Sequence, residues 1–317
     1  MARTPLSGTQ HCLRAGDAQA IIAGVGASLR AYEHEGRPLV LGFEADEVRP
    51  GYRGATLAPW PNRVVDGRYR FADADQLLPL TERSRSHALH GLLAWTEYAV
   101  TDKGPSHVTL AATVEPQTGY PWRVHVETSF VLAADGLTQT VRAHTEGDSA
   151  APWGTGPHPY LVAGEGRVDD WMLHLPASRV LEVTPDRLVP TRLADVTTDP
   201  ERFDFRAARR VGSVEIDHAF TGLDRTADGT TTVAVTDSTG RGAAITWSLD
   251  CPWVQVHTAD QPEGEASPAH RTGLAVEPMT CAPDAFNAGS YDFDTGLLLL
   301  EPGGEPVAAG WTIHPVG

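Results

Sequence analysis

The sequence predicts an all-β protein, and three observations lead to this class. Short segments in which apolar and polar residues alternate recur along the chain, as at residues 108–114 and 123–131, and a period of two is typical of strands. The 31 glycines and 24 prolines separate these segments at short intervals, which favours strands joined by turns. Many short antiparallel strands form sandwiches or barrels. We therefore expect a single domain over residues 1–317 that folds as a large antiparallel β-sandwich.

The clearest elements are two hairpins. Residues 123–131 lead through Ala134-Asp135-Gly136 into the alternating segment 137–142, and Asp-Gly between two such segments is typical of a tight β-hairpin. Residues 232–236 and 243–247 alternate in the same way on either side of a turn that contains Ser, Thr and Gly. Each pair is therefore expected to form neighbouring antiparallel strands.

Two other segments depart from the strand pattern. Residues Glu201–Arg210 carry a weak helical pattern. Residues Asp260–Arg271 contain Gly, Pro, Ser or Glu at nearly every step, which favours a loop at the rim of the fold. The chain shows no internal repeat, low-complexity linker or clear domain boundary, and this agrees with a single domain.

Charge and cysteine content narrow the class of partner. The chain has 25 Lys and Arg residues against 41 Asp and Glu residues, a net charge of −16 without any basic cluster, which argues against nucleic acid and favours a small-molecule ligand. The three cysteines lack metal-type spacing, and residues 1–10 lack the apolar core of a signal peptide. The longest aliphatic segment, residues 297–300, is far shorter than the about 20 residues of a membrane helix. We expect a soluble, cytoplasmic monomer or homodimer that binds no membrane.

His158 is the first candidate for acid–base chemistry. It lies between Pro157 and Pro159, and two prolines stiffen the backbone that presents the imidazole. A ring that titrates near neutral pH and is held in one place suits a general acid, because proton transfer depends on geometry before it depends on pKa. A structural histidine in a Pro-rich turn fits the same residues equally well.

Glu277 is the second candidate, because it follows the apolar residues 274–276 and precedes Pro278. Burial would raise the pKa of this carboxyl and a hydrogen-bonding or charged partner would lower it, which is how a general base is tuned. A glutamate at a strand end in water is the structural alternative.

Asn62 and Arg63 place an amide and a guanidinium side by side, and planar forked donors suit the vicinal hydroxyls of a sugar. The alternative is a surface arginine paired with Asp66. His87 and His90 lie three residues apart, with Gly91 next to His90. They could be metal ligands, but no third ligand follows at a telling spacing.

Alternation also orders the polar residues of two predicted strands. Asp217 and His218 would point to opposite sides of a strand, so that only one of them faces a ligand. Gln255 and His257 would share one face with Trp253. Aromatic and amide groups on one face are common in sugar sites, although a buried tryptophan is more often part of the core.

Together these short motifs resemble the galactose mutarotase, or aldose 1-epimerase, family over residues 50–314. The motifs that carry the resemblance are, in chain order, Asn62-Arg63, His90-Gly91, His158-Pro159-Tyr160, Asp217-His218, Gln255 and Glu277-Pro278, followed by Pro283-Asp284-Ala285-Phe286-Asn287. The resemblance implies a large β-sandwich of the galactose mutarotase type with an open cleft, no metal and no cofactor.

The resemblance also implies a role for each group. His158 would be the general acid at the ring oxygen of a hexose, and Glu277 the general base at the anomeric hydroxyl. Removal of one proton and delivery of the other opens the hemiacetal to an aldehyde, and reclosure gives the other anomer. The sugar would be oriented by a second set of residues, Asn62, Arg63, His90, Asp217 and Gln255.

Departures from the family pattern concern the substrate. Leu92 follows Gly91 where the best-known galactose mutarotases have a second glycine, and His257 stands where they have tyrosine. The residues around His158 and Glu277 resemble a bacterial subgroup of mutarotase-like proteins, one of which is linked to sulfoquinovose. A neutral hexose is favoured here, because no cluster of basic residues predicts a sulfonate or phosphate site.

Other functions stay open from the sequence alone. A hexose-6-phosphate 1-epimerase would need several cations near the sugar, and Arg53 with Arg63 is the one nearby pair. A glycoside hydrolase could use Asp217 and Glu277 if these carboxylates lie about 5–9 Å apart, but it would not need His158. A non-catalytic sugar-binding β-sandwich would not need an imidazole and a carboxylate with shifted pKa values.

Overall fold

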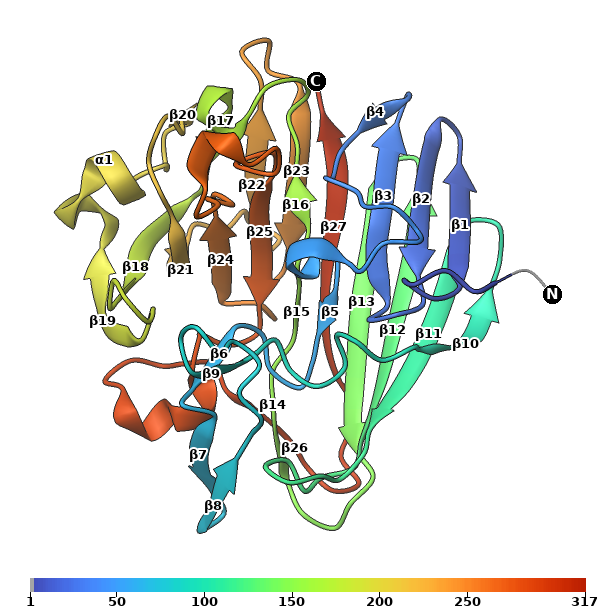
Figure 1. The fold of residues 1–317 in the computed structure, drawn as a ribbon, viewed down its shortest axis with the longest axis vertical. Coiled ribbons are helices and arrows are strands. Elements are labelled where there is room, and N and C mark those ends of the chain that lie inside the picture. Colours follow the sequence, from blue (N-terminus) through green and yellow to red (C-terminus); the bar gives the residue numbers. More distant parts are fainter. Residues whose placement is uncertain (1–2) are drawn as a thin grey trace.

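The computed structural model describes residues 3–317, which form three antiparallel sheets and several two-stranded ribbons (Figure 1). The largest sheet has nine strands. In spatial order they are β10 (Ala99–Lys103), β11 (His107–Val114), β12 (Val124–Ala133), β13 (Gly136–Thr145), β27 (Val307–Val316), β23 (Gly242–Trp247), β22 (Thr231–Thr236), β17 (Met172–His174) and β20 (Arg209–Arg210).

The second sheet has six strands and the third has four. The six-stranded sheet runs in the order β16 (Tyr160–Leu161), β25 (Leu274–Met279), β24 (Trp253–His257), β21 (Asp217–Leu223), β18 (Ala177–Val183) and β19 (Pro190–Asp195). The four-stranded sheet consists of β1 (Gln10–Ala15), β2 (Ala18–Ala23), β3 (Ser28–His34) and β4 (Arg37–Pro38).

Short ribbons and helical turns complete the described chain. The ribbons pair β5 (Thr56–Leu57) with β15 (Gly156–Pro157), β6 (Arg63–Val65) with β9 (His87–Leu89), β7 (Arg68–Phe71) with β8 (Ala74–Leu77), and β14 (Ala151–Trp153) with β26 (Leu298–Leu300). The helical segments are α1 (Pro200–Phe203) and the 3₁₀ turns η1 (Pro50–Tyr52), η2 (Val168–Asp170), η3 (Val196–Thr198), η4 (Gly264–Ala266) and η5 (Ala285–Ser290).

One continuous hydrophobic core joins the three sheets. It contains Leu13 from the four-stranded sheet, Val126 from the nine-stranded sheet and Val254 from the six-stranded sheet, all fully buried. Alternation explains this: along β12 the residues that face the core alternate with residues that face outward. The predicted class, a large antiparallel β-sandwich, is confirmed.

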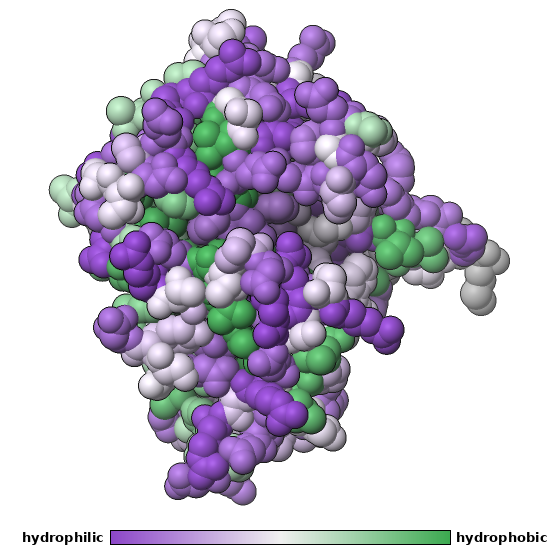
Figure 2. Space-filling model, turned by 60° about the vertical axis from the view of Figure 1, so that its left-hand side comes forward, coloured by the Kyte–Doolittle hydropathy of each residue, from purple (hydrophilic) through white to green (hydrophobic). Residues whose placement is uncertain are grey.

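The surface agrees with the high content of charged residues. The face in Figure 2 is mostly hydrophilic, and its hydrophobic residues form separate small groups. Within residues 3–317, no helix has the length and hydrophobicity needed to span a bilayer.

Both predicted hairpins are confirmed, as β12–β13 and β22–β23. The predicted helix at Glu201–Arg210 is wrong beyond its first turn. Helix α1 ends at Phe203 because Asp204 adopts an extended backbone and its carboxylate accepts hydrogen bonds from the backbone and side chain of Arg206. Arg209 and Arg210 then pair with β17 as a strand.

Candidate active site

A cavity of about 300 Å³ lies over one face of the six-stranded sheet. All seven residues predicted from the sequence line this cavity, although they are spread over more than 200 positions of the chain. They are Asn62, Arg63, His90, His158, Asp217, Gln255 and Glu277. The structure therefore brings the complete predicted set together.

Strand register places three of these residues on one face of the sheet. Gln255 on β24 lies directly opposite Glu277 on β25, and Asp217 on β21 lies opposite His257. Side chains two residues apart on a strand point to the same side, so Gln255 and His257 face the same cavity. By the same rule Trp253 shares this face, but it does not line the cavity and packs with Leu181, Ala219, Met279 and Ala282 in a small hydrophobic cluster.

His158 lies in the short link between β15 and β16. Its backbone N–H donates to the carbonyl of Ala55 (3.0 Å), and its carbonyl accepts from the N–H of Gly54 (2.7 Å). These bonds and the flanking prolines fix the ring, whose Nε2 lies 3.6 Å from Oε1 of Glu277. Both side chains are almost completely buried, with 7% and 2% of their surface exposed.

Burial dominates the electrostatics of this pair. It lowers the pKa of His158 to about 3, with a further contribution from the nearby His257. It raises the pKa of Glu277 well above its ordinary value, and the negative charge of Asp217 adds to that rise. Burial therefore disfavours the charged form of both groups, so the shift favours a proton on Glu277 over one on His158.

Arg63 lies between two carboxylates of the cavity wall, those of Glu82 and Asp217. Its Nε and Nη2 donate to the two carboxylate oxygens of Glu82 (2.8 and 3.0 Å), and Nη2 also lies 3.6 Å from Oδ2 of Asp217. Oδ1 of Asn62 accepts from the backbone N–H of Arg63 (2.9 Å). Such a bidentate pair fixes the guanidinium plane, so Arg63 is pre-oriented before any ligand binds.

Asp217 is held as a carboxylate. Burial opposes ionisation, but His257, Arg63 and a hydrogen bond from Gln255 lower the pKa of Asp217 to about 2. Nε2 of Gln255 donates to Oδ1 of Asp217 over 2.6 Å. This carboxylate is therefore a hydrogen-bond acceptor at any pH at which the protein works.

His90 is positioned by a tight turn. Asn62 and His90 both have a positive φ, near 55° and 61°, and Nδ1 of His90 accepts from the backbone N–H of Asn62 (3.2 Å). Because burial holds the pKa of His90 well below its ordinary value, the ring is neutral and its Nε2 carries the remaining hydrogen. A side chain at Gly91 would place Cβ 2.1 Å from the carbonyl oxygen of Ala58, so only glycine fits beside this turn.

His87 and His90, considered together as metal ligands, have different neighbours. Nε2 of His87 bonds to the carbonyl of Arg187, and Nδ1 accepts from the N–H of Asp66, so His87 holds a loop. A different group of three could hold a metal ion: ligand atoms of His90, His158 and Glu277 lie within 4.8 Å of one another. This group coincides with the acid–base pair.

Several wall residues escaped the sequence analysis. They are Tyr52, Glu82 and Arg85. Tyr52 lies against the ring of His90, with the ring centroids 4.6 Å apart, and the turn-forming Pro50-Gly51 before it could have drawn attention to it. Glu82 has no motif around it; it reaches Arg63 because β9 pairs with β6. The loop at Asp260–Arg271 was predicted correctly to lie at the rim, since Asp260 lines the cavity.

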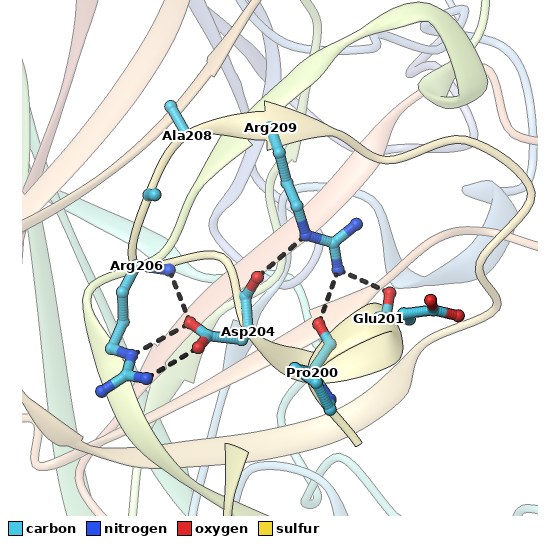
Figure 3. Close-up of a pocket in the computed structure, with 7 residues that line it drawn as sticks. Pro200, Glu201, Asp204, Arg206, Ala208 and Arg209 are labelled. Atoms are coloured by element: carbon cyan, nitrogen blue, oxygen red, sulfur yellow. Dashed lines mark hydrogen bonds and ion pairs between the residues drawn. The ribbon is translucent and has the colours of Figure 1, made fainter. Parts of the chain in front are cut away.

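A larger hollow of about 750 Å³ lies at α1 and the loop that follows it. Its polar groups bind one another (Figure 3): Arg206 pairs with Asp204, while Arg209 donates to the carbonyls of Pro200, Glu201 and Asp204. The hollow contains no histidine, and its cations are already satisfied. The acid–base groups are all in the smaller cavity.

The fold and this cavity define a class: an antiparallel β-sandwich whose concave site pairs a buried imidazole with a buried carboxyl and surrounds them with sugar-compatible donors and acceptors. A sequence model of the aldose 1-epimerase family matches residues 9–305, and the chain belongs to that family.

Relatives and solved structures agree with this assignment. The uncharacterized Escherichia coli K12 protein YihR is 35% identical over 298 residues, which cover 94% of this chain and 90% of YihR. The structure of a GalM/aldose epimerase homologue from C. elegans superposes with a TM-score of 0.81 at 20% identity, covering 97% of this chain and 99% of that one. A galactose 1-epimerase from Lactobacillus acidophilus superposes with a TM-score of 0.78 at 18% identity, covering 97% and 94%.

Proposed function

We propose that the protein is an aldose 1-epimerase that interconverts the α and β anomers of a hexose. The observation that carries this proposal is the buried pair of His158 Nε2 and Glu277 Oε1, 3.6 Å apart in a cavity lined by sugar-compatible groups. Anomer exchange needs one proton donor and one proton acceptor at the same ring, and this pair supplies both.

In the proposed reaction, Glu277 accepts the proton of the anomeric hydroxyl O1 and His158 donates a proton to the ring oxygen O5. The C1–O5 bond breaks, its electron pair goes to O5, and C1 becomes an aldehyde carbon. After rotation about C1–C2, O5 attacks the opposite face of the aldehyde. His158 takes back its proton from O5 and Glu277 returns its proton to O1, which leaves the enzyme unchanged.

The proton count fits this scheme. The resting pair holds one proton on Glu277 because burial lowers the pKa of His158 and raises that of Glu277. A bound sugar donates its O1 hydroxyl to Glu277 and offers O5 to His158, and hydrogen bonds to the charged form of a group favour that form. Substrate binding therefore shifts the proton from Glu277 to His158, ready for ring opening.

Unpaired polar atoms in the wall support sugar binding. Among the described residues, Nδ1 of His158, Oε1 of Gln255 and Oε2 of Glu277 are buried without a hydrogen-bond partner. Buried polar atoms are rarely left unpaired in a folded protein, and sugar hydroxyls can both donate and accept. Gln255 and Glu277 then join Asn62, Arg63, His90 and Asp217 as the proposed sugar contacts.

The charges of the wall favour a neutral hexose over a phosphorylated one. The two cations that line the cavity are already paired, Arg63 with Glu82 and Arg85 with the same carboxylate (2.9 Å). Arg53, the other cation considered for a phosphate, does not line the cavity and donates to the carbonyl of Gly42. An anionic group would therefore compete with Glu82 for both guanidinium groups.

We also keep cytoplasmic location as part of the proposal. Cys12, Cys251 and Cys281 are all free thiols, and unpaired cysteines are typical of reducing compartments. Fractionation of cells that express the protein, followed by detection with an antibody, would test this location.

Polarimetry tests the proposed activity. Freshly dissolved α-D-glucose and α-D-galactose are followed with wild-type protein and with Glu277→Gln. The proposal expects the wild type to speed the approach to anomeric equilibrium and the variant to lose that effect. Unchanged rates with both sugars and with their 6-phosphates would contradict it.

A further inference from the structure

A second chamber opens beside the candidate active site. It has a volume of about 390 Å³ and shares four wall residues with the first cavity, namely Arg85, Asp217, His257 and Asp260. Neither His158 nor Glu277 is among the shared residues. The chamber is thus adjacent to the first cavity, while His158 and Glu277 do not line it.

The topology fixes the direction in which the chamber extends. Glu277 is on β25, Gln255 on β24 and Asp217 on β21, and the sheet continues through β18 to β19 (Figure 1). Three further wall residues, Val183, Pro185 and Leu188, come from the end of β18 and the connection to β19. Neighbouring strands lie about 4.8 Å apart, so the path from β25 to this connection is longer than one pyranose ring.

The volume of each chamber matches one small ring rather than two. Ligand pockets span about 300–1,000 Å³, and the first cavity, at about 300 Å³, is at the lower limit. A hexose that places C1 at His158 and Glu277 fills it. A substituent on the far side of that hexose would enter the second chamber between Arg85 and His257.

The walls of the second chamber combine apolar and polar groups. Val183, Pro185 and Leu188 form an apolar side, and Arg202 and His218 offer polar groups on another side. Pyranose rings present apolar C–H faces and polar hydroxyl edges, so a wall of this composition suits a second sugar ring.

Charge decides between a neutral and an anionic occupant. Two cations line the chamber, Arg85 and Arg202, against three carboxylates, Glu215, Asp217 and Asp260. Arg85 is already paired with Glu82, and Arg202 donates to the carbonyl of Glu215 and lies over the ring of Phe203. Counting the arginines and the carboxylates alone, the excess of one negative charge disfavours an anionic substituent.

We propose that this chamber binds a second glycosyl unit, so that the preferred substrate is the reducing end of a neutral di- or oligosaccharide. This inference rests on the proposed anomer exchange, because it assigns the reducing unit to the cavity with His158 and Glu277. The second unit contacts Leu188 and Arg202 and takes no part in proton transfer.

Anomer exchange of maltose, glucose and glucose 6-phosphate tests the proposal. In the wild type, kcat/KM for maltose is expected to exceed that for glucose and that for glucose 6-phosphate. Leu188→Trp fills the chamber and is expected to lower kcat/KM for maltose roughly tenfold or more, a loss of about 1.4 kcal/mol, with glucose unchanged. Arg202→Ala, which removes a side chain without adding bulk, is expected to act in the same direction by a smaller factor.

Leu249→Trp is the matched control, because Leu249 is a leucine that is 69% exposed and lines neither chamber. This variant is expected to leave kcat/KM unchanged for both maltose and glucose. The inference is overturned if kcat/KM of the wild type is tenfold higher for glucose than for maltose, or if it is highest for glucose 6-phosphate. It is also overturned if Leu188→Trp and Arg202→Ala lower kcat/KM for maltose and for glucose by the same factor.

Calorimetric binding separates failure of this inference from failure of the proposed function. If the enzyme accelerates anomer exchange of none of these sugars, the proposed function fails. Binding of maltose then tests separately whether the second chamber holds a glycosyl unit. Tighter binding of maltose than of glucose that is lost in Leu188→Trp would support the chamber. Equal binding of the two sugars by the wild type would overturn it.

Discussion

Two buried glutamines contrast a structural position in this fold with a position in the candidate active site. Gln139 on β13 uses both ends of its amide: Nε2 donates to Oγ1 of Thr56 (2.8 Å) and Oε1 accepts from Nε1 of Trp311 (3.0 Å). Gln255 on β24 is as deeply buried, but only its Nε2 is bonded, to Asp217, and its Oε1 has no partner among the described residues.

The difference extends to the surroundings of each residue. Gln139 joins a strand of the nine-stranded sheet to Trp311 and Thr56, both buried, and so contributes to the packing of the sandwich. Gln255 lies beside Asp217 and opposite Glu277, in a wall where four polar atoms of the described residues are buried without a partner. An unpaired buried group costs stability, and under the proposed function a bound sugar would supply the missing partner of Gln255.

The largest expected effect is at the acid–base pair. His158→Asn and Glu277→Gln are each expected to lower kcat for anomer exchange by about 10²–10⁴-fold, the usual contribution of a general acid or base. The double variant is expected to lose little more than the worse single one, since the two groups act as a unit. Thermal unfolding should show melting temperatures no lower than that of the wild type, because each change relieves a buried ionisable group. Activity within threefold of wild type in either variant would remove that residue from the mechanism.

A smaller effect is expected at the residue that orients Arg63. Glu82→Gln breaks the bidentate pair with Arg63 (2.8 and 3.0 Å), which should raise KM roughly tenfold and leave kcat within a few-fold, because Arg63 is proposed to hold the sugar. Glu182→Gln is the control: Glu182 forms a similar bidentate pair with Arg192 (2.6 and 2.9 Å) away from the cavity. Steady-state kinetics of both variants measure these changes in KM and kcat. An equal rise in KM in Glu82→Gln and Glu182→Gln would refute a specific role for Glu82.

The two glutamines themselves give the sharpest contrast. Gln255→Leu is expected to lower kcat/KM roughly tenfold with little change in stability, because it removes a proposed sugar contact. Gln139→Leu is expected to destabilise the fold by about 1–3 kcal/mol, because the indole N–H of Trp311 loses its acceptor, while activity is retained. Denaturant unfolding and kinetics on both variants measure this contrast, and the reverse assignment of effects would contradict it.

The smallest expected effect is the response of the wild type to pH. The active pair holds one proton, so activity is lost at low pH when His158 gains a proton and at high pH when Glu277 loses one. Because burial lowers the pKa of His158 to about 3 and raises that of Glu277, kcat/KM, which reports the free enzyme, should be flat through pH 6.5. A fall in kcat/KM centred near pH 6.5, the ordinary value for histidine, would contradict this account.

Much of the fold followed from local patterns in the sequence. The hairpins β12–β13 and β22–β23 were predictable because period-two alternation and turn residues are both local properties. The segment Glu201–Arg210 was not, because Asp204 and Arg206 stop the helix after one turn and β17 recruits Arg209 and Arg210 as a strand. Tertiary pairing overrode a weak local preference there.

In the candidate site too, some residues could be predicted from local sequence patterns and others could not. His158 and Glu277 could be picked out because prolines and apolar neighbours mark their environment in the sequence. Glu82 could not, because it meets Arg63 only through the pairing of β6 with β9. Contacts of this kind depend on register between strands distant in the chain.

The most direct test of the central claim is exchange NMR on an equilibrium mixture of hexose anomers. We expect wild-type protein to accelerate exchange between the α and β anomeric signals without forming any other product. His158→Asn and Glu277→Gln should leave exchange at the uncatalysed rate. Exchange at the uncatalysed rate with the wild type, for neutral mono- and disaccharides alike, would contradict the assignment of His158 and Glu277 as an acid–base pair for anomer interconversion.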